Sequence, residues 1–331
     1  MPIHDVGYRG WEGERTSQLS RWCIISTTGI KLAAQSRWVR RILFVAWLPV
    51  MYWGIGFFFI ENAISDDSAA VKAGISQTLS GSFAAFPHAK DLANSLASDD
   101  PAQIRNDVWR WLLMVFFRYP QAILILFLIG AVGPALISQD MRSRAFLLYF
   151  SRPIGKLEYM FGKLCIPAAF IAAVTTLPAL ALYAFAILMS PEFSVFWSTW
   201  DIPIRIILAT FALVIPTSSV VLMLSSLTQE SRFASFSWFA LWALGHGAWM
   251  AIVVATAIQM SKPPFHPEVL NSNMVQGWSA LSLYNCLGIV QSWIFGFQTF
   301  SESWRGIASL TAITTFSLGM LYRRVSAPIQ V

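Results

Sequence analysis

The chain has 331 residues, of which 56% are hydrophobic and 12% charged, with a formal net charge of +6. A soluble globular chain carries about 25% charged residues. The composition therefore predicts an all-α polytopic membrane protein, and a membrane β-barrel is excluded because ten-residue segments of alternating polarity are absent. The cations are spread over loops between apolar runs, which does not indicate nucleic-acid binding. Three unclustered cysteines, Cys23, Cys165 and Cys286, predict neither a disulfide framework nor a metal site.

The first 41 residues are polar, and we expect no cleavable signal peptide there. Within them, residues 19–41 carry small and apolar side chains at three- and four-residue steps with cations around them. This pattern predicts one amphipathic helix on the inner membrane surface. We expect the chain to divide into a cytoplasmic N-terminus, residues 1–41, and a transmembrane domain, residues 42–331.

About six apolar runs are expected to cross the membrane, because a spanning helix needs roughly 20 residues. They are residues 42–60, 119–137, 164–189, 202–227, 233–260 and 307–321. The uncharged segment 269–301 is interrupted throughout by Asn, Gln and Ser. We expect it to be interfacial or re-entrant, with Trp278, Tyr284 and Trp293 at headgroup depth.

The distribution of cations predicts the orientation. Of the 23 Lys and Arg residues, 15 lie in residues 1–41, 138–163, 228–232 and 322–331, and the positive-inside rule places these segments in the cytoplasm. We therefore expect a multi-pass protein of the plasma (inner) membrane with both termini cytoplasmic. Residues 61–110 and 261–303 would lie outside. The first of these is long enough for a small helical cap, and its Trp109-Arg110-Trp111 end is typical of an interface anchor.

No pattern in the chain predicts an enzyme. It has no Gly-x-x-x-x-Gly-Lys-Ser/Thr loop, no His-Glu-x-x-His pair and no Gly-x-Ser-x-Gly elbow, so we expect no catalytic residue, metal or cofactor. His246 is the one histidine within an expected span; helix packing explains it best, and it is a weak candidate for substrate binding. Arg118 and Arg205 lie close to outer span ends, where we expect them to snorkel. No series of Asp, Glu or Lys crosses the bilayer interior, so the energy source is expected elsewhere.

One cytoplasmic segment carries specific phrases. It contains Asp140-x-x-Ser-Arg144, Leu148-Tyr-Phe-Ser-Arg-Pro153, Glu158-Tyr and Phe161-Gly-Lys-Leu164. This run resembles the cytoplasmic loop of type-2 ATP-binding-cassette (ABC) permeases, the bacterial exporter-type membrane subunits, in which an acidic residue precedes Leu-Ser-Arg-Pro, a Tyr and Gly-Lys. The order of spans and loops is also similar. Arg144-Ala145 departs from the Gly common in the family, and the 61–110 loop is larger than in its smallest members.

The resemblance implies a permease subunit of an ABC transporter, an exporter, that forms the translocation path as a homodimer or a heterodimer with a related permease. ATP would be bound and hydrolysed by a separate ATPase subunit, and membrane lipid would surround the dimer. Residues 141–150 would form a coupling helix that Pro153 ends. The residues expected to couple the chain to the ATPase are Asp140, Arg142, Arg144, Phe146, Leu147, Tyr149, Arg152, Pro153, Glu158 and Lys163.

Other interpretations of the same residues stay open. The loop could be an ordinary one that its arginines hold against anionic lipid. The chain could also be a non-transporting anchor of an envelope complex, or an intramembrane enzyme that uses His246. The cargo is not identified, although spans without buried charge favour an apolar or amphiphilic substrate over an ion.

Overall fold

The computed structural model describes residues 20–65, 100–145, 154–190 and 192–326, and the short pieces 73–74, 76–77, 88–89 and 92–93. These residues form helices and connecting turns, with no strand among them. Five helical stretches are long and apolar enough to cross a membrane, namely Arg37–Asn62, Ala102–Arg142, Lys156–Met189, Asp201–Ser226 and Ser231–Met260. The predicted all-α polytopic membrane fold is confirmed.

The N-terminal part consists of α1 (Arg21–Ala34), α2 (Arg37–Val45) and α3 (Leu48–Ser65). The prediction of one amphipathic helix over 19–41 is wrong, because Ser36 has an extended backbone, with ψ at 128°, and separates α1 from α2. Helix α1 packs on the later helix α10 (Lys156–Val174). Ser26 donates a hydrogen bond of 2.9 Å to the carbonyl of Gly162 in α10. Protein contacts therefore hold α1 in place.

A long helical run follows the first outer loop. It comprises α6 (Pro101–Phe116), the π-helix η2 (Phe117–Gln121), α7 (Ala122–Val132) and α8 (Ala135–Arg142). Pro120 lies inside η2, and because proline has no N–H group it disturbs the regular α-helical hydrogen bonds. The outer loop is shorter than the predicted 61–110, since α3 continues to Ser65 and α6 already begins at Pro101.

Two tryptophans of α6 are buried. Trp109 and Trp111 are 0% and 4% exposed, and the Trp109 ring lies 6.2 Å from that of Phe57 in α3 and 6.0 Å from that of Tyr183. The predicted interface anchor is therefore wrong. These rings bury their large apolar area between helices.

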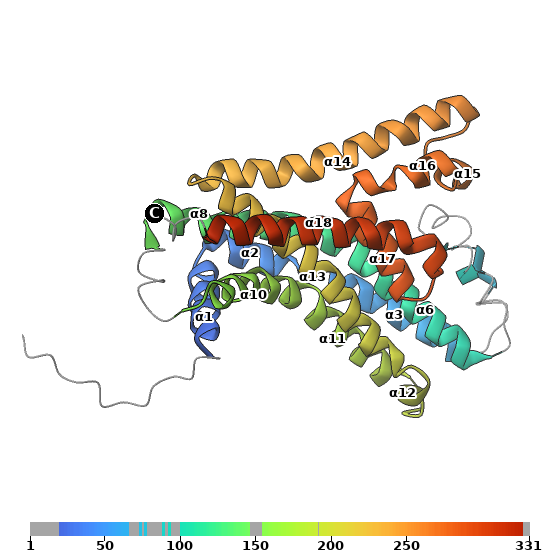
Figure 1. Ribbon diagram of the computed structural model, residues 1–331. Coiled ribbons are helices and arrows are strands. Elements are labelled where there is room, and N and C mark those ends of the chain that lie inside the picture. Colours follow the sequence, from blue (N-terminus) through green and yellow to red (C-terminus); the bar gives the residue numbers. More distant parts are fainter. Residues whose placement is uncertain are drawn as a thin grey trace, which may run out of the picture.

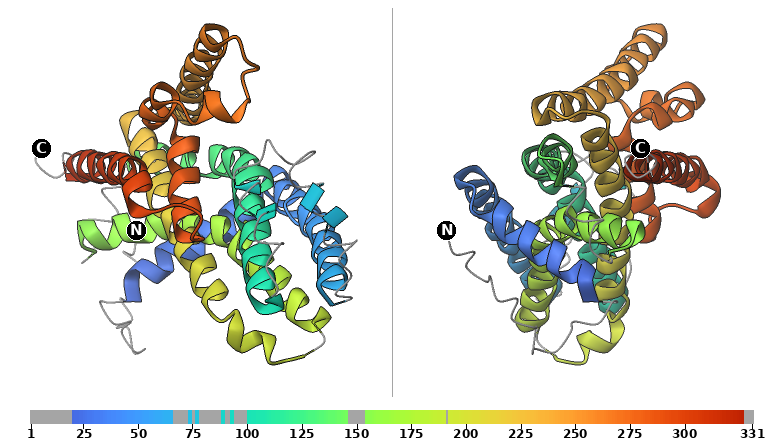
Figure 2. Two further views of the ribbon diagram at one scale, coloured as in Figure 1. Left: turned by 90° about the vertical axis from the view of Figure 1, so that its right-hand side faces the viewer. Right: turned by 60° about the vertical axis from the view of Figure 1, so that its left-hand side comes forward.

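Helix α13 is the centre of the bundle. The middle of the chain forms α10, α11 (Thr176–Met189), α12 (Val195–Ser198), α13 (Asp201–Leu227) and α14 (Ser231–Met260). Helix α13 contacts α8, α10, α11 and α14, and also the two last helices of the chain, α17 (Leu283–Ile294) and α18 (Phe300–Ser326). Figures 1 and 2 show α14 at one edge of the bundle. Its outward face carries exposed apolar side chains such as Leu244 and Ile258.

Four short helices join α14 to α18. They are α15 (Pro267–Leu270), α16 (Asn273–Gly277), η3 (Ser279–Leu281) and α17. The segment approaches the middle of α14 at η3, where a Cβ atom placed on Gly245 would lie 2.7 Å from the carbonyl oxygen of Leu281. It then returns along α17 until the carbonyl of Ile294 accepts a hydrogen bond from Arg205, in the first turns of α13. The segment thus runs toward the middle of α14 and then back along α17, which matches the re-entrant alternative predicted for 269–301.

Helix α18 contains the sixth predicted span, 307–321, and packs along α13 and α17. It is more polar than the five long apolar stretches and is not among them, so its crossing stays a prediction. Its C-terminal turns lie at the same end of the bundle as α1, α2 and α8 (Figure 1). We call this the basic end; the last turns of α3, the first of α6, and α12 and α15 lie at the opposite end.

Candidate functional site

Two residues of the predicted coupling set form a largely buried ion pair at the basic end. The Nζ atom of Lys163 lies 2.6 Å from an Oδ atom of Asp140, and the two side chains are 9% and 15% exposed. The Tyr159 hydroxyl donates to the same carboxylate at 2.7 Å, and Lys163 also donates to the carbonyl of Leu136 at 2.7 Å. This network ties α8 to α10. Asp140 and Lys163 therefore position the loop.

Ser225 of α13 provides a second tie to α8. Its hydroxyl donates to the carbonyl of Pro134 at 2.6 Å and accepts from the backbone N–H groups of Ile137 and Ser138 at 3.1 and 3.0 Å. The first N–H groups of a helix have no partner within it, and Ser225 satisfies two of them. Sequence analysis missed this residue. The only signal was a small polar pair, Ser225-Ser226, at the end of an apolar span.

The far end of α8 is exposed to solvent. Arg142, whose side chain is 69% exposed, lies 3.6 Å from Glu230 in the turn between α13 and α14. Arg144 is exposed and has a left-handed backbone, with φ at 54°. The predicted continuous helix 141–150 is therefore wrong at its start, because α8 ends at Arg142. Glu158 instead accepts a hydrogen bond of 3.0 Å from the N–H of Gly155 and caps α10.

The remaining predicted coupling residues, Phe146, Leu147, Tyr149, Arg152 and Pro153, lie outside the described residues. Of the described members, the structure brings Asp140 and Lys163 together and leaves Arg142 and Arg144 at the surface. The described set therefore divides into a buried positioning pair and an exposed cationic tip.

Cations at the two ends of the bundle differ in their partners. Four near the opposite end form ion pairs, namely Arg105 with Glu61, Arg110 with Asp107, Arg205 with Asp201 and Lys262 with Glu268. At the basic end, several have no carboxylate partner among the described residues; these are Arg37, Arg40, Arg41, Arg144, Arg323 and Arg324. Uncompensated positive charge thus gathers at one end, as expected of the cytoplasmic side of a membrane protein.

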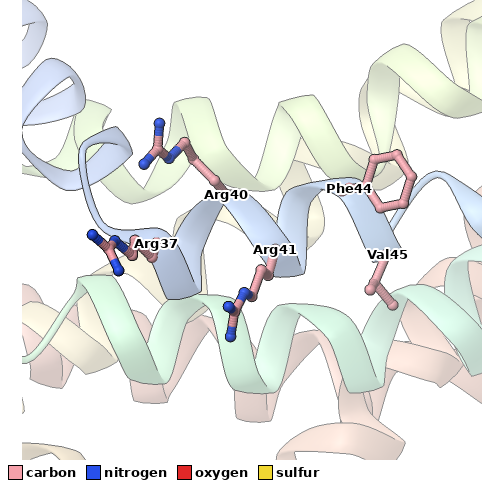
Figure 3. Close-up of a pocket in the computed structure, with 5 residues that line it drawn as sticks. All are labelled: Arg37, Arg40, Arg41, Phe44 and Val45. Atoms are coloured by element: carbon pink, nitrogen blue, oxygen red, sulfur yellow. The ribbon is translucent and has the colours of Figure 1, made fainter.

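Three of these unpaired arginines belong to α2. Arg37, Arg40 and Arg41 line a hollow of about 480 Å³ together with the apolar side chains of Phe44 and Val45 (Figure 3). Figure 3 shows Arg40 and Arg41 pointing to opposite sides of the helix. The Arg41 guanidinium also lies 5.4 Å from the exposed ring of Trp38. Cations beside exposed aromatic and apolar side chains suit the headgroup layer of a membrane, where the predicted N-terminal helix was expected.

A polar cluster lies deeper in the bundle. The Arg118 guanidinium is 5.0 Å from the centre of the Tyr284 ring, and that ring is 5.4 Å from the ring of His246, halfway along α14. The predicted snorkelling of Arg118 and headgroup position of Tyr284 are therefore wrong, because both side chains turn inward. Arg205 pairs with Asp201 at 2.7 Å at the opposite end.

The composition of these sites bears on metal binding. Among the residues that the structure describes, no group of three His, Cys, Asp or Glu side chains could hold a metal ion. Lys163 pairs with Asp140. Arg118 lies beside the Tyr284 ring and has no carboxylate partner among the described residues.

Comparison with known families accounts for nearly the whole chain. No individual curated protein matches it. The model of one family, described as ABC-2 family transporter protein, matches residues 31–324. This range includes the α8–α10 network, the deep polar cluster and the five long apolar stretches. The chain therefore belongs to the ABC-2 transporter family, as a multi-pass membrane subunit of the permease type.

Proposed function

We propose that this chain is the permease subunit of an ABC exporter that works as a dimer with a separate ATPase. Family membership supports a transport role for the membrane subunit, and the sequence has no phosphate-binding loop of its own. Export follows from the resemblance of the cytoplasmic loop to exporter-type permeases. The basic end would face the cytoplasm of the inner membrane, with both termini on that side.

The observation that carries the proposal is the bracing of α8. Helix α8 is tied to α10 through Asp140, Lys163 and Tyr159, and to α13 through Ser225. A push on its exposed tip would therefore be passed to two long helices together, since packed and hydrogen-bonded elements move as units. An ordinary surface loop needs no such support. The exposed cations Arg142 and Arg144 are then suited to contact an acidic surface on the ATPase.

Charge reversal at the tip tests this proposal. Arg144→Glu is expected to weaken capture of the partner ATPase at least about tenfold, because reversing a charge in a desolvated contact commonly costs more than 1.4 kcal/mol. Insertion and thermal stability should stay as in the wild type, since Arg144 is exposed and makes no ion pair with the described residues. The measurement is co-purification of the ATPase at increasing salt, with Arg152→Glu as a second variant.

Arg323→Glu, at an exposed position in the last turn of α18, is the matched control and should capture the ATPase normally. Equal loss in the control would indicate a general effect of charge at the basic end. Normal capture by both loop variants would return the loop to a lipid-binding role and place the membrane-anchor interpretation first.

A further inference from the structure

Arg118 has an unusual position for a charged residue. It lies in η2, near the middle of the helical run from Ala102 to Arg142, and at the level of His246, halfway along α14. A charge at such a depth in a membrane protein is costly, and ionisable residues there typically serve function.

The contacts of Arg118 hold its guanidinium in place but do not neutralise it. Besides lying over the Tyr284 ring, it occupies the space beside Gly288, where a Cβ atom would be 1.1 Å from Nη1. Any larger residue at 288 would displace the guanidinium. No carboxylate within ion-pair distance of Arg118 is found among the described residues, and its Nε–H has no hydrogen-bond partner although it is buried.

Other polar atoms close by are also unpartnered. The Nδ1 atom of His246 and the Nε1–H of Trp249 are buried without a partner, and their two rings are 5.6 Å apart. Both polar atoms of the Asn285 side chain are also buried without a partner, and Asn285 directly follows Tyr284 in the sequence. Buried polar groups are normally hydrogen-bonded, because a buried group without a partner has lost its hydrogen bonds to water and gained none in return. Several unpaired groups, one of them cationic, indicate a site for a polar ligand.

We propose that Arg118, His246, Tyr284 and Trp249, here called the Arg118 cluster, bind the anionic headgroup of an amphiphilic substrate. The inference rests on the permease function proposed above and specifies its substrate class. A guanidinium presents a planar fork that matches the oxygen atoms of a phosphate or carboxylate. Leu281 of η3, which lies against Gly245 of α14 and is 45% exposed, offers an apolar surface for the attached chain.

The test uses the full-length chain alone, purified in dodecyl maltoside, with dodecyl phosphate added as a minor component of the micelles. Thermal unfolding is followed with a dye that reacts with thiols as they become exposed, such as that of Cys286, which is buried in α17. Dodecyl phosphate should raise the Tm. Dodecyltrimethylammonium, with the same chain and the opposite charge, and inorganic phosphate without a chain should not.

Variants distinguish a binding role from a packing role. Arg118→Gln should lose the response to dodecyl phosphate while its ligand-free Tm equals or exceeds that of the wild type, because an unpaired charge has been removed. Arg118→Lys keeps the charge without the fork, and its response should need at least about tenfold more dodecyl phosphate. Arg323→Gln, on the exposed end of α18, should respond normally.

A normal response of Arg118→Gln, or a ligand-free Tm well below that of the wild type, would overturn the proposal and assign the guanidinium to packing. Stabilisation of the wild type by the cationic amphiphile as well would show non-specific partitioning, with the same consequence. None of these results depends on the ATPase. Capture of the ATPase by Arg118→Gln, measured separately, reports on the permease function independently.

Discussion

Asp140 and Lys163 hold α8 against α10 through a contact that is shielded from water on most sides. A shielded carboxylate is stable only with its partners in place, because removing one charge leaves the other buried and uncompensated. Tyr159 and the carbonyl of Leu136 complete the arrangement by occupying further hydrogen-bonding positions. The orientation of the basic tip thus depends on a small number of polar atoms.

The replacement Lys163→Met is expected to destabilise the protein by about 3–5 kcal/mol, because it leaves Asp140 without its counter-charge. The double variant Lys163→Met with Asp140→Leu should recover most of this loss, since no unpaired charge then remains. Unfolding in detergent, followed by tryptophan fluorescence, measures both. If the single variant is as stable as the double one, the pair contributes nothing to the position of α8.

For single residues, the sequence indicated which side chains are candidates for a functional role, but not which of them contact one another. Asp140 and Lys163 were both assigned to the coupling loop, yet their pairing depends on the path of the chain between them. Arg118 shows the same limit more clearly. Its position near an apolar run predicted snorkelling, but the choice between water and the Tyr284 ring depends on a re-entrant segment far along the chain.

Among the elements, α14 packs on the four helices of the re-entrant segment, and one of these contacts is a tight one between the backbones. Gly245 faces the carbonyl oxygen of Leu281 with no room for a side chain, whereas Gly247 has no atom within 4 Å of the corresponding position. The two glycines lie in the same helix two residues apart. They are therefore a matched pair for measuring what this contact contributes.

Gly245→Ala is expected to lower stability by about 1–3 kcal/mol, because the new methyl group must displace the backbone of η3. Gly247→Ala should be neutral or stabilising by up to about 1 kcal/mol, the usual effect of replacing glycine by alanine inside a helix. Thermal unfolding compares the two, and thiol labelling of Cys286 reports whether α17 has shifted. Equal effects of both substitutions would show that the approach is not tight.

The long helices were largely predictable because twenty apolar residues in succession have few alternatives to a membrane helix. The residues at which these helices begin and end were less predictable. The first span was expected to end before Glu61, and Arg105 was assigned to the outer loop, but in the structure the two residues pair with each other inside the helical bundle. Mean hydropathy counts such a pair as two polar residues, although together they expose little charge.

For the molecule as a whole, the asymmetry of charge pairing sets the expected topology. Reporter fusions after Gln229 and at the C-terminus should read cytoplasmic, and fusions after Pro191 and Lys262 should read external, because most of the cations that lack a carboxylate partner among the described residues lie at the basic end. Alkaline phosphatase activity and green fluorescence give opposite readouts of each site. An external C-terminus would mean that α18 does not cross as predicted or that the re-entrant segment spans the membrane.

The π-helix η2 has a consequence for how this molecule tolerates insertions and deletions. A π-turn contains one more residue than the α-helical turn it replaces. Deleting one residue there would restore a regular α-helical turn, and the side chains of α7 would keep their directions relative to α6, because both kinds of turn complete one full rotation. The same deletion after Leu128, inside α7, would rotate every later side chain of the helix by about 100°. Val132, which now packs with Leu128 toward α2 and α10, would turn away from them. The length of the chain is therefore constrained more strongly within α7 than at Phe117–Gln121.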